Sequence, residues 1–249
     1  MHPILQGIIL GFVIVLPGMS GGTVFIILGI YEKIIRDLSV FNLRPYWTLL
    51  LGSVVGIFLG GFSFSFLFVS YRNIAVAFLL GLLLASIKSV MEDRPSVSFG
   101  RVVILAAGFA TAILMADEPL GLVGQSKDVN FAILILGGAV SSATMLIPGI
   151  PGSSILIVLG IYDDVLFYIR ELAVLNLLIF GVAGLLGIVF LAKILDRLYS
   201  RYKAPTAYFF AGLIAGSSRV LLPSELTISV AAFFAAGFSL VWFYGGGRK

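Results

Sequence analysis

The sequence Leu16-Pro17-Gly18-Met19-Ser20-Gly21-Gly22-Thr23 interrupts an otherwise apolar run near the start of the chain. A related sequence, Ile147-Pro148-Gly149-Ile150-Pro151-Gly152-Ser153-Ser154, stands 131 residues later. Both continue into one tail, Leu28-Gly29-Ile30-Tyr31-Glu32 and Leu159-Gly160-Ile161-Tyr162-Asp163. From position 16 to 31, 8 of 16 residues are identical at this offset, so the chain contains an internal duplication.

The duplication extends well beyond this motif. At the same offset, Tyr71-Arg72 corresponds to Tyr202-Lys203, and Lys88 corresponds to Arg219. With a shift of two residues, the sequence of 106–109 also returns at 235–238. The function must therefore be sought in a pair of related halves.

The composition indicates a membrane protein. The chain is 60% hydrophobic and 11% charged, whereas a soluble domain carries about 25% charged residues. Several segments reach the roughly 20 apolar residues that span a bilayer. The absence of cysteine excludes disulfides and thiolate metal sites, and the only histidine is His2. We expect no cleavable signal peptide, metal, cofactor, catalytic residue or nucleic-acid partner.

We predict an all-α polytopic membrane protein that forms a single membrane domain over residues 1–249. The first repeat, 1–120, comprises a broken hairpin at 4–35, with arms 4–16 and 21–35, and transmembrane helices at 46–70, 74–91 and 99–116. The second repeat, 131–245, comprises a hairpin at 131–170, with arms 131–147 and 152–170, and helices at 173–197, 206–221 and 226–244. The short arms favour re-entrant hairpins, and the alternative is a kinked helix that crosses the membrane.

The distribution of basic residues decides between these two topologies. If each hairpin enters and leaves on one face, the second half is inverted and Lys and Arg divide 12 to 4 between the faces. If each hairpin crosses, they divide 8 to 8. Cytoplasmic loops are enriched in Lys and Arg. We therefore predict an inverted repeat in the cytoplasmic (inner) membrane, with six transmembrane helices, two re-entrant hairpins and both termini cytoplasmic.

The hairpin tips are candidate anion sites. Two hairpins from opposite faces bring their tips together near the midplane, and a helix begins at each tip. Helix N-termini offer free N–H groups and a partial positive charge. Glycines let a ligand approach the backbone, and the same residues could instead serve only helix packing. The residues predicted to cap these helices or admit a ligand are Ser20, Gly21, Gly22, Thr23, Gly152, Ser153 and Ser154.

Charged pairs near the helix ends form a second set of candidates. Lys88 and Arg219 could guide an anionic headgroup from opposite faces, or could simply snorkel to the interface. Glu32 and Asp163 could couple transport to protons, or could be solvated. Tyr71-Arg72 and Tyr202-Lys203 are typical interface anchors.

Gly18-Met19-Ser20-Gly21-Gly22 also fits the G-x-S-x-G nucleophile pattern. That motif requires a strand before the serine and a general base, and the flanking sequence here is that of membrane helices. We therefore do not expect an enzyme.

The first motif with its Gly29-Ile30-Tyr31-Glu32 tail, and the second Pro-Gly element with its own tail, resemble the PopT-type polyprenyl-phosphate transporter family. The resemblance covers essentially the whole chain. It implies transport of undecaprenyl phosphate, or a related polyprenyl phosphate, across the cytoplasmic membrane, which recycles the carrier lipid for cell-envelope synthesis. The matching positions are Pro17 to Thr23 and Pro148 to Ser154, which adds Pro17, Gly18, Pro148 and Gly149 to the candidate headgroup residues.

The resemblance agrees with the physical argument, because a lipid phosphate combines an anion with an apolar tail that can stay in the bilayer. The expected partners are this lipid and the surrounding membrane lipids. The alternative is a small-anion channel or carrier that uses the same helix ends. The sequence leaves open the chain length of the lipid, the direction of transport, the coupling ion and whether the protein forms homo-oligomers.

Overall fold

Glycine residues divide the second arm of each hairpin into two helices. The computed structural model describes residues 2–14, 20–91, 96–115, 130–171 and 173–244. Helix α2 (Gly21–Ile27) is separated from α3 (Tyr31–Ser39) at Gly29, where φ is +68°, and α7 (Gly152–Val158) from α8 (Tyr162–Arg170) at Gly160, where φ is +69°. Glycine adopts positive φ at little cost. The prediction of single segments at 21–35 and 152–170 is therefore wrong.

The remaining described segments are also helical, and no strand occurs among them, which confirms the all-α class. A kink at Tyr71, where φ is −141° and ψ is 42°, replaces the predicted break between 46–70 and 74–91. Two short 3₁₀ helices are η1 (Arg44–Tyr46) and η2 (Ser218–Leu221). The other helices are α1 (Pro3–Ile14), α4 (Trp47–Val90), α5 (Phe99–Met115), α6 (Phe131–Thr144), α9 (Val174–Arg201), α10 (Lys203–Ser217) and α11 (Ile228–Tyr244).

The backbone repeats with the same offset as the sequence. Helices α7 and α8 begin and end 131 residues after α2 and α3. Tyr202, which separates α9 from α10, has φ of −131° and ψ of 45°, close to the values at Tyr71. The same sequence signals therefore bend the chain in the same way twice.

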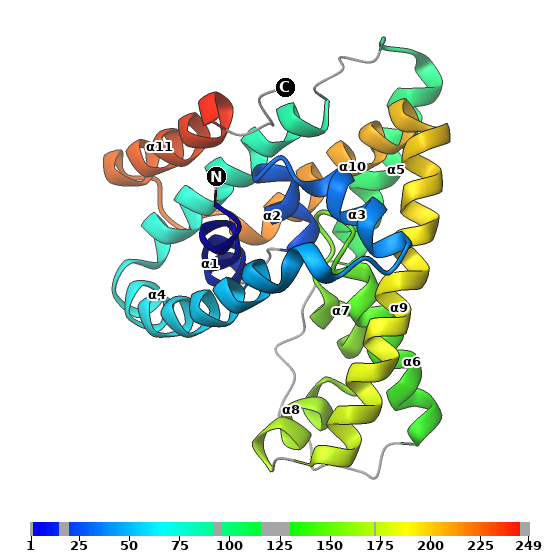
Figure 1. Cartoon of the computed structure of the whole chain (residues 1–249). Helices are drawn as coiled ribbons and strands as arrows, with labels where there is room; N and C mark the ends of the chain where they lie inside the picture. Colours follow the sequence, from blue (N-terminus) through cyan, green and yellow to red (C-terminus); the bar gives the residue numbers. More distant parts are fainter. Residues whose placement is uncertain (1, 15–19, 92–95, 116–129, 172, 245–249) are drawn as a thin grey trace.

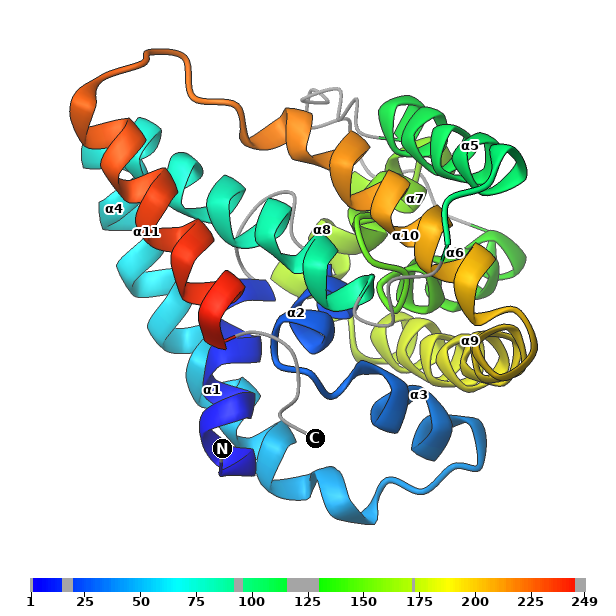
Figure 2. The same ribbon diagram turned by 90° about the horizontal axis from the view of Figure 1, so that it is seen from above.

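The last helix of each half packs against the other half (Figure 2). Helix α5 lies along α10, and α11 lies along the second part of α4. A Cβ atom at Gly81 would lie 2.3 Å from the carbonyl oxygen of Phe234, and one at Gly237 would lie 2.2 Å from that of Phe78. Small residues allow membrane helices to approach this closely. These glycines therefore serve packing within the chain.

Long apolar surfaces remain exposed on the outer helices. Within the described residues, Tyr71–Val90 and Val174–Arg201 are long and apolar enough to cross a membrane, and four other apolar helices are shorter. Large exposed apolar patches mark surfaces that contact lipid or another protein. On α9 the side chains that are more than half exposed include Leu175, Leu178, Val182, Leu185, Leu186 and Phe190.

The centre of the molecule is formed by α2 and the loop before α7 (Figure 1). Ile26 and Tyr31 pack in one buried cluster with Leu83 of α4 and Leu213 of α10. Leu146 and Ile150, from the second copy of the motif, belong to the same cluster. The core therefore holds the two copies of the motif together.

Candidate functional site

The two copies of the motif contact each other directly. Gly22, in the first turn of α2, donates its backbone N–H to the carbonyl oxygen of Met145 at 2.8 Å. The free N–H groups at the start of a helix need partners outside the helix. Here the end of α6 supplies one of them, so the start of α2 is closed by the second half.

Two hydroxyl groups complete this contact. Ser20 Oγ and Thr23 Oγ1 are 3.0 Å apart, and both side chains are 0% exposed. Ser20 caps α2 by accepting the N–H of Thr23 at 3.3 Å, as the sequence predicted for an N-cap. The N–H of Gly149 donates to both hydroxyl oxygens at 3.1 Å. Four groups from the two halves therefore share one buried hydrogen-bond network.

Backbone approaches backbone at this contact. A Cβ atom at Gly22 would lie 2.2 Å from the carbonyl oxygen of Leu146, and one at Gly152 would lie 2.6 Å from that of Ser141. Gly149 has φ of +83°, and a Cβ atom there would lie 2.8 Å from the carbonyl oxygen of Leu213. At Gly21 the nearest atom would be 3.5 Å away. In this conformation the glycines admit the protein's own backbone where the sequence predicted a ligand.

The structure describes only part of the predicted tip residues. Pro148 is fully buried beside Gly149. Pro17 and Gly18 lie outside the described residues. Ser153 and Ser154 lie in the first turn of α7, and their side chains are outside what the structure describes.

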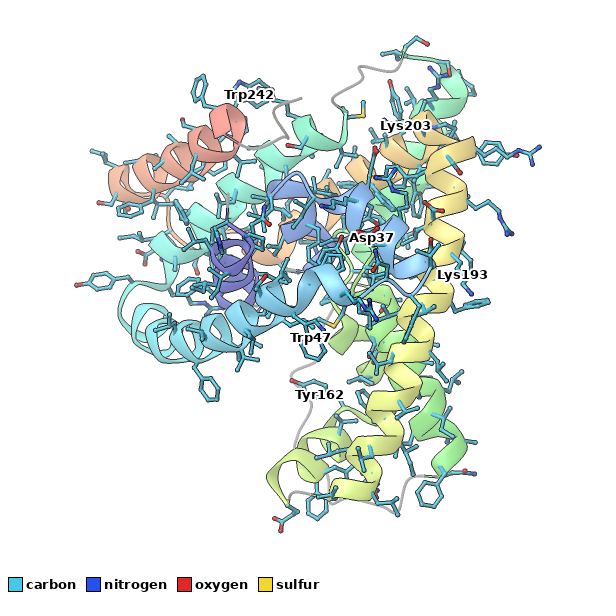
Figure 3. The ribbon with its side chains drawn as sticks, in the orientation of Figure 1. Asp37, Trp47, Tyr162, Lys193, Lys203 and Trp242 are labelled. Atoms are coloured by element: carbon cyan, nitrogen blue, oxygen red, sulfur yellow. The ribbon has the colours of Figure 1, made fainter. Side chains whose placement is uncertain are left out.

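Lys88 and Arg219 lie on the surface near the ends of equivalent helices. Lys88 donates to the carbonyl oxygen of Trp242 at 2.7 Å, and its ammonium group is 4.5 Å from the centre of the Trp242 ring, on α11 (Figure 3). Arg219 is exposed in η2. In this conformation Lys88 contacts α11 and stabilises its packing on α4.

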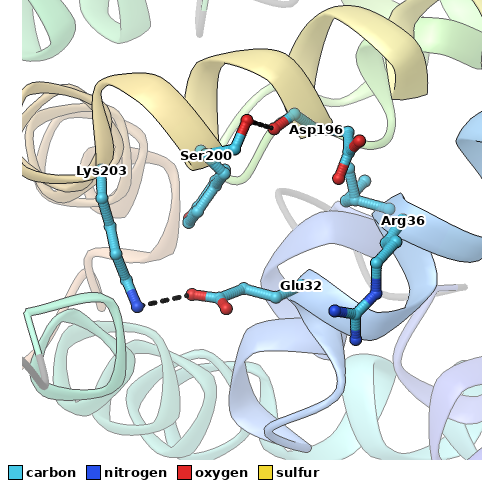
Figure 4. A pocket seen from close by; sticks show the side chains of 7 residues that line it. Glu32, Arg36, Asp196, Ser200 and Lys203 are labelled. Atoms are coloured by element: carbon cyan, nitrogen blue, oxygen red, sulfur yellow. Dashed lines mark hydrogen bonds and ion pairs between the residues drawn. The ribbon is translucent and has the colours of Figure 1, made fainter.

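A polar cavity of about 320 Å³ lies between α3, α9 and the start of α10 (Figure 4). The carboxylate of Glu32 is 3.2 Å from the ammonium group of Lys203 across it. Asp163, the counterpart of Glu32, begins α8 beside Tyr162, and its side chain is outside what the structure describes. The polar residues that line the cavity are Glu32, Arg36, Asp196, Tyr199, Ser200 and Lys203.

Sequence reasoning missed this cavity, although it predicted roles for two of its residues. Glu32 was a candidate for proton coupling, and Lys203 was assigned to an interface anchor. The available signal was the tail of the motif, because a carboxylate follows Gly-Ile-Tyr in both copies, as Glu32 and as Asp163. What the sequence does not encode locally is that α3 packs against α9 from the other half.

The chemistry available at the buried contact is that of neutral hydrogen-bond donors and acceptors. The Ser20 hydroxyl is held by Thr23 and by the N–H of Gly149, neither of which is a general base. Within the described part of the chain, no group of three or more Asp, Glu or His side chains could hold a metal ion.

The fold and the site together define a helical membrane protein built around two copies of one broken-helix motif. A family profile described as VCA0040-like, undecaprenyl phosphate translocase-like, matches residues 3–95 and 64–234. The chain belongs to this family, which confirms the resemblance seen in the motifs.

Two curated relatives are named polyprenyl-phosphate transporter. The protein from Vibrio cholerae is 29% identical over 247 residues, which cover 90% of this chain and 78% of the relative. The protein from Staphylococcus aureus is 30% identical over 241 residues, which cover 88% of this chain and 85% of the relative. No solved structure matches the chain. The helical fold and these relatives indicate a membrane protein. Both relatives are named as transporters of polyprenyl phosphate.

Proposed function

We propose that this protein moves undecaprenyl phosphate, or a related polyprenyl phosphate, between the leaflets of the cytoplasmic membrane. Net return of the lipid to the inner leaflet would recycle it for cell-envelope synthesis. The observation that carries the proposal is the buried contact between the two copies of the motif, in a chain whose relatives are named as transporters of this class of lipid. Transporters built from repeats bind their substrates where such broken helices meet.

The proposal includes an inverted arrangement of the repeats 1–120 and 131–245, with a re-entrant hairpin in each. Two contacts support it. Glu32 pairs with Lys203, and Asn73 Oδ1 accepts the N–H and the hydroxyl of Ser224 at 3.1 and 3.3 Å. The re-entrant topology puts both members of each pair on one face, whereas crossing hairpins would put them on opposite faces.

Labelling of single cysteines tests this topology, because the chain contains no cysteine of its own. Lys33 and Glu225 are both exposed. We expect a membrane-impermeant maleimide to label Glu225→Cys in intact cells and Lys33→Cys only after permeabilisation. Labelling of both from outside would overturn the inverted arrangement.

In the conformation described here, the two copies of the motif must separate before a headgroup can bind between them. The N–H of Gly22 is already bonded to Met145, and the hydroxyls of Ser20 and Thr23 are already bonded to Gly149. A phosphate can reach these donors only after the two copies of the motif separate. We therefore propose that the headgroup passes between the tips while the halves rearrange, and that the prenyl tail stays in the bilayer.

We also propose that protonation of Glu32 or Asp163 couples transport of the lipid to the movement of protons. A pH gradient imposed across proteoliposomes tests this coupling.

Lys88 and Arg219 are proposed to receive the headgroup at the two faces. In that role Lys88 would exchange its contact with Trp242 for the phosphate, which attracts an ammonium group more strongly than a carbonyl does. Proteoliposomes that contain labelled polyprenyl phosphate test the role. Flux by the double variant Lys88→Ala with Arg219→Ala should fall well below wild type, and unchanged flux would exclude it.

The first experiment is binding of undecaprenyl phosphate to the purified protein, measured by native mass spectrometry with phosphatidylglycerol as competitor. We expect selective binding that is weakened by Gly21→Val, which adds a branched side chain where the structure has room for a methyl group. No preference over phosphatidylglycerol would contradict the proposal. Flux of a small anion in proteoliposomes that contain no polyprenyl phosphate would then favour the alternative of an anion channel or carrier.

A further inference from the structure

The Glu32–Lys203 ion pair joins the two halves of the protein at one end of their interface. Glu32 lies on α3 of the first half, and Lys203 begins α10 of the second. The charged groups are 3.2 Å apart, and each side chain is more than half exposed. An ion pair this exposed contributes little stability, so it can break and form readily.

The packing beneath this ion pair is closed. Helix α3 lies along α9 (Figure 1). The ring of Tyr31 is 5.5 Å from that of Tyr199 and 5.9 Å from that of Phe210. Its hydroxyl donates to the carbonyl oxygen of Leu146 at 3.0 Å, and the side chain is only 4% exposed. Residues of both halves therefore exclude water from the Tyr31 side chain, below the cavity that Glu32 and Lys203 line.

The sequence repeats both members of the Glu32–Lys203 ion pair. At an offset of 131, Glu32 corresponds to Asp163 and Lys203 to Arg72, with the same signs of charge. Arg72 follows the kink at Tyr71 just as Lys203 follows the bend at Tyr202. Helix α8, which contains Asp163, corresponds to α3 residue for residue.

The second set is nevertheless packed differently. Among the described residues, α8 lies against α7 and α9 and is not packed along α4, as it would be if it repeated the contact of α3 with α9 (Figure 1). Tyr162, the counterpart of the buried Tyr31, is 36% exposed. Figure 3 places Tyr162 and Lys203 toward opposite ends of α9. One sequence pattern thus has two packings in the same molecule.

We propose that Glu32 with Lys203 and Asp163 with Arg72 are two gates that close alternately. In this conformation the first gate is closed, because α3 lies along α9, and the second is open, because in the described part of the chain α8 is not packed along α4. When the halves exchange their packing, α8 closes on α4 and brings Asp163 to Arg72, while α3 leaves α9. A bound ligand that interacts more favourably with one conformation than with the other can shift the balance between them. The inference rests on the inverted arrangement proposed above, which makes the closed gate cytoplasmic.

Paired cysteines test the gates directly in this cysteine-free chain. We expect Glu32→Cys with Lys203→Cys, and separately Asp163→Cys with Arg72→Cys, to form disulfides in membranes under copper-phenanthroline. The mixed pairs Glu32→Cys with Arg72→Cys and Asp163→Cys with Lys203→Cys join positions on opposite faces and serve as controls. Failure of the Asp163–Arg72 pair to exceed the mixed controls would overturn the proposal.

Transport by the cross-linked proteins gives the second result. Each disulfide should abolish flux of polyprenyl phosphate in proteoliposomes, and reduction should restore it. The charge exchange Glu32→Lys with Lys203→Glu should recover flux that Glu32→Lys alone loses. Flux that survives either complete cross-link would refute the gates. If both cross-links form but wild type moves no polyprenyl phosphate, the gates stand and the proposed substrate is wrong.

Discussion

The backbone N–H of Gly149 donates a hydrogen bond to the hydroxyl oxygen of Ser20 at 3.1 Å, across 129 residues of sequence. Each residue belongs to one copy of the repeated motif, at different positions within it. The contact is therefore asymmetric, although the two copies are related. It fixes one arrangement of two halves that could in principle meet in another.

Loss of both hydroxyls at this contact should destabilise the protein. In Ser20→Ala with Thr23→Val, the buried N–H of Gly149 loses both acceptors, which costs about 1–3 kcal/mol of unfolding free energy. Thermal unfolding in detergent, followed by the loss of monodisperse protein, measures the effect. Ser86→Ala is the control, because that buried hydroxyl only donates to a carbonyl of its own helix. Equal unfolding temperatures for the double variant and the control would contradict the role of this network.

The adjacent glycines Gly21 and Gly22 of α2 should differ in how well they tolerate substitution by alanine. Gly22→Ala places a Cβ atom 2.2 Å from the carbonyl oxygen of Leu146, so the halves must separate and the yield of folded protein should fall sharply. Gly21→Ala meets nothing closer than 3.5 Å and should fold like wild type. Expression and size-exclusion profiles of the two variants give the comparison. Similar profiles would mean that α2 does not approach Leu146 this closely in the membrane.

The repeated motif predicted where chain breaks occur better than it predicted where helices end. Ser20 as the cap of α2 and the interruption before Gly152 follow from local chemistry, since serine caps helices and Pro and Gly interrupt them. The break at Gly29 was also visible in the sequence, because the same Leu-Gly-Ile-Tyr run returns at Gly160. It was missed because a single glycine within an apolar run is compatible with a continuous membrane helix.

The sequence could not predict that α5 packs against the second half and α11 against the first. In a soluble protein the apolar face of a helix identifies the side that packs. A membrane helix is apolar on the lipid side as well, so α11 has no polar face to reveal its partner. The repeat of Gly108 at Gly237 was detectable and indicated a close contact, but the identity of the contacting helix depends on tertiary structure.

The crossing of α4 and α11 supplies a third prediction. Gly81→Ala and Gly237→Ala each place a methyl group within 2.3 Å of a backbone oxygen of the other helix, and either should lower thermal stability. Gly181→Ala on α9 meets nothing within 4 Å and should be neutral or slightly stabilising, because alanine favours helices more than glycine does. Unfolding temperatures measured in one detergent test the ranking. A stable Gly81→Ala protein would mean that these helices lie farther apart.

Symmetry-related tyrosines supply the last prediction, because the structure places them in unlike surroundings. Tyr31→Phe removes a buried hydrogen bond to the carbonyl oxygen of Leu146, which should cost about 1 kcal/mol of unfolding free energy. Tyr162→Phe changes a side chain that is 36% exposed and should have a smaller effect. Thermal unfolding of the two variants, side by side, measures the difference. If the protein populated both packings equally during the measurement, each tyrosine would be buried half of the time and the two variants would lose the same stability. A larger loss in Tyr31→Phe therefore identifies the conformation described here as the predominant one under the conditions of the assay.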